Sequence, residues 1–176
     1  MSSWKQAVQA QMLFAQNALA KSKELESESR ALLQQKQCLN AAVLSLRESW
    51  LCWLNEWAEL LEPKGKRERI ESWKGFLRLH ANAPTVEQVA ANIAIGDSWV
   101  KGFIELESLT AYDWLDHLVQ NEPDESPESF ASQNALSLVQ VNVRPCSVLN
   151  GRDDLERMLT ELKLHIEKLR EQHSEW

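Results

Sequence analysis

The sequence predicts an all-α protein, an antiparallel helical bundle of four main helices with shorter helices at one end. Its 176 residues include only five glycines and five prolines, which are too few for the frequent turns of an all-β protein. Apolar residues recur at intervals of three and four along several segments, and this is the period of a helix that buries one face. We expect the whole chain, 1–176, to form a single domain.

The first two main helices are expected within 3–61, where neither glycine nor proline occurs. One helix of that length would extend about 88 Å, which is too long for a domain of this size, so the chain must reverse direction. The polar stretch 21–29 is the natural place for the reversal and predicts helices over 3–22 and 28–61. The apolar side chains of the second helix form one stripe, made of Leu32, Leu39, Val43, Leu46, Trp50, Trp53, Trp57 and Leu60.

Three further helices are expected before residue 120. The segment 62–65 contains both a proline and a glycine and ends the second main helix. A basic helix is predicted over 66–80. A brief helix is predicted over 86–95, because Thr85 opens a capping-box pattern, and the third main helix is predicted over 98–119.

The C-terminal third combines a predicted loop with the last main helix. Residues 120–133 contain two prolines and four acidic residues, a composition that predicts a mobile acidic loop. Residues 137–143 alternate polar and apolar as a strand would, but no second strand is predicted to pair with them. The last helix opens at Asp153, and its apolar positions keep a spacing of four and three: Leu155, Leu159, Leu162, Ile166 and Leu169.

Charge and cysteine content restrict the compartment and the partners. Residues 1–90 carry 12 basic and 10 acidic side chains, whereas residues 91–176 carry 7 and 16, which argues against general affinity for nucleic acid. The three cysteines show no metal or redox spacing. On one helix, Cys38 and Cys52 would lie about 21 Å apart, beyond disulfide reach, so reduced thiols are expected, Cys146 included. No secretory signal or long apolar run occurs, so we expect a cytoplasmic protein without a membrane span.

Sequence motifs of catalysis are absent. The chain has no phosphate-binding glycine loop and no nucleophile elbow. None of its four histidines follows an arginine at the spacing used by some helical ribonucleases. We interpret His117, with Asp113 and Asp116, as a half-buried imidazole oriented by a carboxylate. We therefore expect no catalytic activity, metal or cofactor, and a helical ribonuclease or metal enzyme ranks third among the functions considered.

A basic cluster in the predicted helix at 64–78 is one candidate binding surface. Its cations are interleaved with Trp73 and Phe76, an arrangement that suits stacking on bases and contact with phosphates. A solvated helix face opposite a core stripe would show the same pattern. The candidate residues of a nucleic-acid or anion patch are Lys64, Lys66, Arg67, Arg69, Lys74 and Arg78.

Eight tryptophans in the chain provide the second candidate surface. The spacing of Trp50, Trp53 and Trp57 predicts that these three lie in the core. Trp4 and Trp176 lie near the two ends of the sequence, where they would either cover the end of the bundle or form a contact surface. We expect a non-enzymatic interaction or adaptor protein whose partner is another protein or a second copy of the chain, and nucleic-acid binding is the alternative.

Four short motifs together resemble a known family. The motifs are QMLFA at 11–15, LRESWL at 46–51, DSW at 97–99 and LREQHSEW at 169–176. Their order and spacing resemble those of an uncharacterised family, a domain of unknown function, found as short helical proteins in pseudomonads and related bacteria. The resemblance implies a bacterial cytosolic helical protein, and it implies no activity because the family has none assigned.

Overall fold

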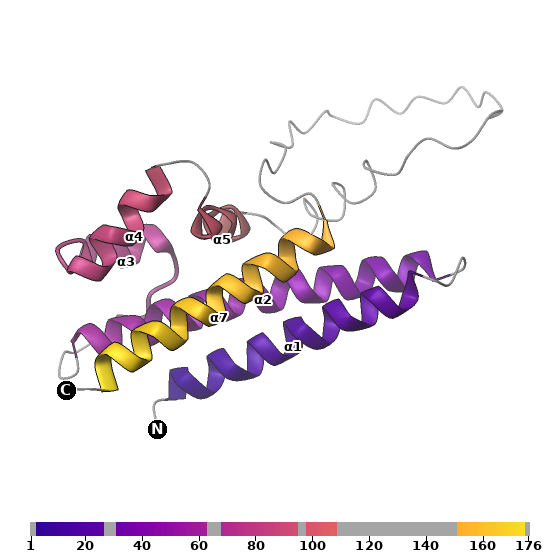
Figure 1. The fold of residues 1–176 in the computed structure, drawn as a ribbon, viewed down its shortest axis with the longest axis horizontal. Helices are drawn as coiled ribbons and strands as arrows, with labels where there is room; N and C mark the ends of the chain where they lie inside the picture. The colour runs from indigo at the N-terminus through magenta and orange to yellow at the C-terminus, as the bar shows by residue number, and fades with distance from the viewer. Residues whose placement is uncertain (1–2, 27–30, 63–67, 95–97, 109–150, 175–176) are drawn as a thin grey trace.

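The computed structural model describes residues 3–26, 31–62, 68–94, 98–108 and 151–174. These residues form six helices and no strand, so the all-α prediction is confirmed for them. The helices are α1 (Ser3–Leu25), α2 (Leu32–Leu61), α3 (Trp73–His80), α4 (Pro84–Ala94), α5 (Trp99–Ser108) and α7 (Arg152–Ser174) (Figure 1). None of them is long and apolar enough to cross a membrane.

The three long helices α1, α2 and α7 lie side by side (Figure 1). At one end, Arg152 at the start of α7 forms an ion pair with Glu26, directly after α1. Further along, Lys163 Nζ donates a hydrogen bond of 3.0 Å to Gln16 Oε1, and at the other end Arg170 pairs with Glu56. The helix α7 therefore runs antiparallel to α1 and in the same direction as α2.

The third predicted main helix, 98–119, is described only as far as Ser108. Its described part, α5, is seen nearly end-on in Figure 1, where the long helices run across the picture. It packs tightly on α7, because a Cβ added at Gly102 would lie 2.9 Å from Met158 Sδ. The described residues thus show three long helices crossed by a shorter one, and they do not establish a four-helix antiparallel bundle.

The prediction of a helix over 66–80 is wrong for residues 68–72, the first residues of this range that the structure describes. Residues 68–72 are not helical, and α3 begins at Trp73, where Ser72 Oγ accepts a hydrogen bond of 3.1 Å from the Gly75 N–H and caps the helix. The backbone of Ile70 is instead held by the side chain of Asn55. The backbone N–H and C=O of Ile70, which would pair within a helix, thus form hydrogen bonds with a side chain of α2.

The other helix boundaries differ from the predicted ones by a few residues. The first helix continues to Leu25 rather than 22, the second begins at Leu32 rather than 28, and α4 begins at Pro84 rather than 86. A proline is well suited to a first helical turn because its missing N–H has no partner there. The acidic loop 120–133, the segment 137–143 and the group of Asp113, Asp116 and His117 lie outside the described residues.

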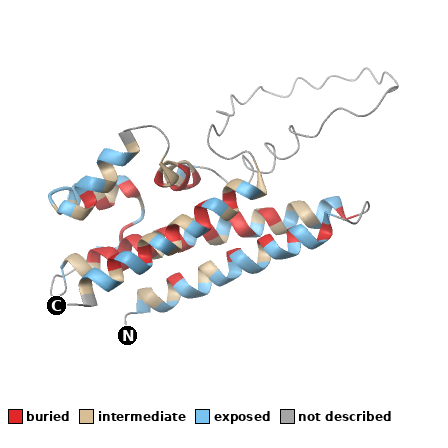
Figure 2. Cartoon of the chain, viewed as in Figure 1, coloured by how far each residue is buried: buried red, intermediate tan, exposed pale blue. Residues whose placement is uncertain are grey.

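Aromatic side chains on α2 form the centre of the core. Buried residues recur along α2 in Figure 2. Trp50, Trp53 and Trp57 are completely buried, as their spacing predicts. The ring of Trp50 stacks on Phe103 of α5 with centroids 5.1 Å apart. The ring of Trp57 lies 4.8 Å from Phe76 of α3. The same stripe of α2 therefore contacts both α5 and α3.

Two carboxylates of the core region join helices that are distant in the sequence. Glu56 of α2 receives two hydrogen bonds from the Arg170 guanidinium, of 2.8 and 2.7 Å, and only 4% of its side chain is exposed. Glu107 Oε1 of α5 accepts hydrogen bonds from Trp50 Nε1 at 2.7 Å and from the Trp73 N–H at 2.8 Å. Burial raises the pKa of Glu107, and these two hydrogen bonds oppose the rise. Removing Arg170 would leave Glu56 as a buried, unpaired charge.

His165 of α7 is enclosed by three indole rings. The centroid of its imidazole lies 5.9 Å from that of Trp53, 5.2 Å from that of Trp57 and 5.3 Å from that of Trp99. Its Nε2 atom is buried and has no hydrogen-bond partner. Burial lowers the pKa of His165 to about 4, and the nearby Lys168 adds to the lowering. The folded protein therefore holds this imidazole neutral.

Acid should destabilise the protein through His165. The unfolded chain has the ordinary histidine pKa of 6.5, so between pH 6.5 and 4 the unfolded state binds a proton that the folded state does not. The free energy of unfolding should fall by about 3 kcal/mol as the pH is lowered through this range, and this contribution should be constant above it. In urea titrations, His165→Phe should gain about 2 to 3 kcal/mol relative to the wild type between pH 7.5 and 4.5. An equal difference at both pH values would contradict this expectation.

Candidate binding site beside Trp4

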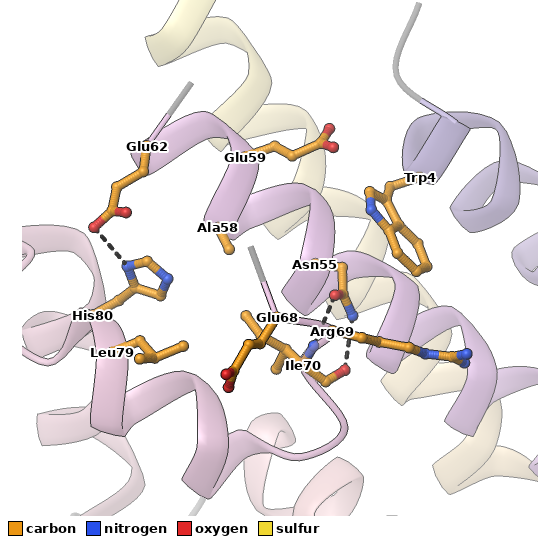
Figure 3. Close-up of a pocket in the computed structure, with 10 residues that line it drawn as sticks. All are labelled: Trp4, Asn55, Ala58, Glu59, Glu62, Glu68, Arg69, Ile70, Leu79 and His80. Carbon is orange, nitrogen blue, oxygen red and sulfur yellow. Dashed lines mark hydrogen bonds and ion pairs between the residues drawn. The ribbon is translucent and has the colours of Figure 1, made fainter. Parts of the chain in front are cut away.

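Two adjoining pockets lie where α1 begins and α2 ends. Their volumes are about 470 and about 280 Å³. Trp4, Asn55, Arg69 and Ile70 line both of them, so the two pockets form one groove (Figure 3). We call the two pockets together the Trp4 groove.

The floor of the Trp4 groove is one face of α2. Its floor residues recur at helical spacing and lie on the opposite side of α2 from the tryptophan stripe. They are Glu48, Leu51, Cys52, Asn55, Ala58, Glu59 and Glu62. The first turn of α1 brings Trp4 to one side of this floor. The other side, which we call the second wall, consists of the segment 68–71 and the end of α3 with Leu79 and His80 (Figure 3).

Asn55 holds the second wall in place. Its Nδ2 donates hydrogen bonds of 2.8 Å to the carbonyl oxygens of Leu51 and Ile70, and its Oδ1 accepts one of 2.9 Å from the Ile70 N–H (Figure 3). The amide thus satisfies both backbone groups of a buried residue that lacks helical hydrogen bonds. Without Asn55, these groups would be buried and unpaired, which is costly.

Charged side chains surround the groove. Two arginines, Arg47 and Arg69, lie among five glutamates, and His80 Nδ1 lies 3.8 Å from Glu62 Oε1. Glu59 is half-buried and the other four glutamates are exposed: Glu48, Glu62, Glu68 and Glu71. Carboxylates therefore outnumber guanidinium groups among the described residues that line the groove.

The chemistry of the lining suits binding. Leu51 and Ala58 of the floor and Ile70 of the segment 68–71 offer apolar contact, and Trp4 adds an indole. Burial raises the pKa of the Cys52 thiol and the neighbouring Glu48 raises it further, which disfavours the nucleophilic thiolate. Across the described ranges, no three histidine, cysteine or acidic side chains are grouped so that they could hold a metal ion.

The structure brings together residues from both predicted surfaces. Trp4, predicted as an interface residue, and Arg69, predicted in the basic cluster, line the same groove. Arg69 also lies with Lys74 and Arg78 around a third concavity of about 760 Å³ on the outer side of 68–79. The remaining candidates fall outside the described residues: Lys64, Lys66, Arg67 and Trp176. Trp99 packs against Trp50 with centroids 6.0 Å apart and does not line the groove.

Neither the floor nor the second wall of the groove was predicted from the sequence. The floor was visible in principle as a second stripe at helical spacing along 48–62. Asn55 was a further signal, since asparagine is unfavourable inside a helix and here lies among tryptophans and leucines. Its partner Ile70 is 15 residues away, and hydrophobic periodicity gives no indication that the two residues pair.

In comparisons with known proteins, no family model, no curated protein and no solved structure matches the chain. The family resemblance of the four motifs at 11–15, 46–51, 97–99 and 169–176 therefore stays a prediction.

Asn55→Ala should release the second wall. It removes the partners of two buried backbone groups, so we expect a loss of about 2 to 3 kcal/mol in the free energy of unfolding. We also expect faster amide hydrogen exchange at Ile70, measured by NMR on the folded protein. Asn17→Ala, at an exposed position of α1, is the matched control and should leave the Ile70 exchange rate unchanged. Normal protection of Ile70 in Asn55→Ala would show that the amide does not hold the wall.

Proposed function

We propose that this chain is a non-enzymatic interaction or adaptor protein and that its partner binds in the Trp4 groove. The observation that carries the proposal is the placement of Trp4 at the side of a groove whose lining combines apolar residues with arginines and glutamates. Tryptophans at such sites often contribute most of the binding energy of an interface. The partner is a second protein or another copy of this chain.

The wider setting of the proposal comes from the sequence. We propose a cytoplasmic location and membership of the bacterial family that the motifs resemble. A ribonuclease or metal enzyme has no supporting observation among the described residues and is not part of the proposal.

Trp4→Ala should weaken partner binding with little loss of stability. A buried interface tryptophan replaced by alanine costs about 2 kcal/mol or more, or at least about thirtyfold in affinity. The measurement is quantitative recovery of partners by the tagged protein from its own cells, with light scattering for self-association. Phe14→Ala is the matched control, because Phe14 is an aromatic residue of the same helix that is 56% exposed and lines neither pocket. Equal recovery and equal mass for wild type and Trp4→Ala would refute the proposed function.

One observation favours nucleic-acid binding as a second candidate. Three of the six predicted basic residues, Arg69, Lys74 and Arg78, share the concavity on the outer side of 68–79. Glu68 and Glu71 line it as well, which reduces its positive charge. The described part of the predicted patch therefore has a modest excess of cations.

Lys74→Glu combined with Arg78→Glu separates this candidate from the Trp4 groove, because neither residue lines the groove. If the concavity binds single-stranded nucleic acid, the double variant should abolish binding at low salt. Wild-type affinity should fall linearly with salt on logarithmic axes. No wild-type binding at low salt, measured by fluorescence anisotropy, would exclude this candidate.

A further inference from the structure

We propose that the end of α5 controls the shape of the Trp4 groove, because Glu107 fastens one end of the second wall while Asn55 fastens the other. Control of the groove by α5 rests on the proposed function, since it affects binding only if a partner occupies the groove. It adds to the site a helix whose described residues line neither pocket.

Glu107 acts directly on the start of α3. Its Oε1 atom accepts a hydrogen bond of 2.8 Å from the N–H of Trp73, the first residue of that helix. The N–H groups of a first helical turn have no partner within the helix, and they favour a negatively charged acceptor. Ser72 Oγ accepts the Gly75 N–H of the same turn. One capping group of α3 is therefore local, whereas the other comes from a residue 34 positions away in the chain.

The same carboxylate also fixes α3 against α2. Its Oε1 atom accepts the indole N–H of Trp50 at 2.7 Å, and the rings of Trp50 and Trp73 pack with centroids 5.8 Å apart. Arg47, which lines the smaller pocket, donates a hydrogen bond of 3.3 Å from Nη2 to the carbonyl oxygen of Glu107. Glu107 therefore joins the second wall to the helix that forms the floor of the groove.

The two attachments hold one short segment of the second wall. Asn55 binds both backbone groups of Ile70, and Glu107 binds the N–H of Trp73. Both residues of the segment are buried, with 5% of each exposed. Loss of either side chain leaves a buried backbone group without a partner, so the segment must move to regain one. Because the attachments lie so close together, release of one end should weaken the other.

Alkylation of Cys52 measures the state of the groove. This thiol lies on the floor and is half-buried, and burial raises its pKa. Movement of the wall should expose the thiol and relieve this rise, and both changes speed alkylation. Cys38 of the same helix lines neither pocket and is the internal control. The folded full chain is treated with iodoacetamide, and modification at each cysteine is followed by mass spectrometry of its peptides.

We expect Glu107→Ala to raise the alkylation rate of Cys52 relative to Cys38 at least about fivefold. Glu107→Gln keeps an oxygen that can accept both N–H groups, so it should leave the ratio within about twofold of the wild type. Glu167→Ala is the matched control, because it removes an exposed carboxylate of α7 that lines neither pocket.

Three labelling results would overturn control by α5. They are an unchanged ratio in Glu107→Ala, an equal rise at Cys52 and Cys38, and a rise in Glu107→Gln as large as in Glu107→Ala. An equal rise at the two thiols would mean that the whole fold loosens and that the wall does not respond by itself.

A double-mutant cycle tests whether the two attachments hold one unit. Asn55 binds Ile70 whereas Glu107 binds Trp73, so the effects of Asn55→Ala and Glu107→Ala should multiply if the attachments are independent. We expect the increase in the unfolding equilibrium constant of the double variant, from urea titrations, to be at least about fivefold smaller than the product of the single increases. An increase equal to that product would overturn the coupling.

The proposed function is decided separately by partner recovery with Trp4→Ala. A partner that depends on Trp4, together with unchanged labelling in Glu107→Ala, would leave the function in place and remove control by α5. Faster labelling in Glu107→Ala without any partner that depends on Trp4 would refute the function and still support the attachment of the wall by Glu107.

Discussion

Burial of the tryptophan stripe of α2 is the constraint on which the rest of the described structure depends. Trp50, Trp53 and Trp57 are too large to be covered by one neighbouring helix. They are enclosed by α7 through His165, by α5 through Phe103 and by α3 through Phe76. The positions of the shorter helices therefore follow from where aromatic surface must be removed from water.

The same constraint explains the buried polar residues of α2. All six residues from Trp53 to Ala58 are buried, and since successive residues of a helix are 100° apart, this part of α2 is surrounded on every side. Asn55 and Glu56 then need partners, because buried polar groups are stable only when paired. Asn55 finds the backbone of Ile70, and Glu56 finds Arg170. One interaction positions a wall of the groove, and the other ties the end of α7 to α2.

The groove is thus a consequence of how the core is completed. Asn55 keeps the segment 68–71 out of the helix that its sequence favours, and this leaves Arg69 and Glu68 beside the floor of α2. The start of α1 closes the opposite side with Trp4. The site is made of three segments that are distant in the sequence: the start of α1, the last turns of α2 and the residues from 68 to the end of α3. Because folding brings these segments together, the walls of the groove are coupled to the stability of this end of the molecule and are not independent loops.

The sequence by itself determined the helical class, the long helices of 3–61 and the burial of the three tryptophans, because these depend on local propensity and on a period that any single helix displays. It also indicated Trp4 and Arg69 as candidate binding residues, but on two separate predicted surfaces. Only the tertiary structure decided that they share a groove, that residues 68–72 are not helical, and that His165 is held neutral among indole rings. The physical reason is that these features depend on contacts between residues that are distant in the sequence, such as the hydrogen bonds of Asn55 with Ile70 and the packing of His165 against tryptophans of other helices. Such contacts do not appear in the hydrophobic periodicity of any one helix.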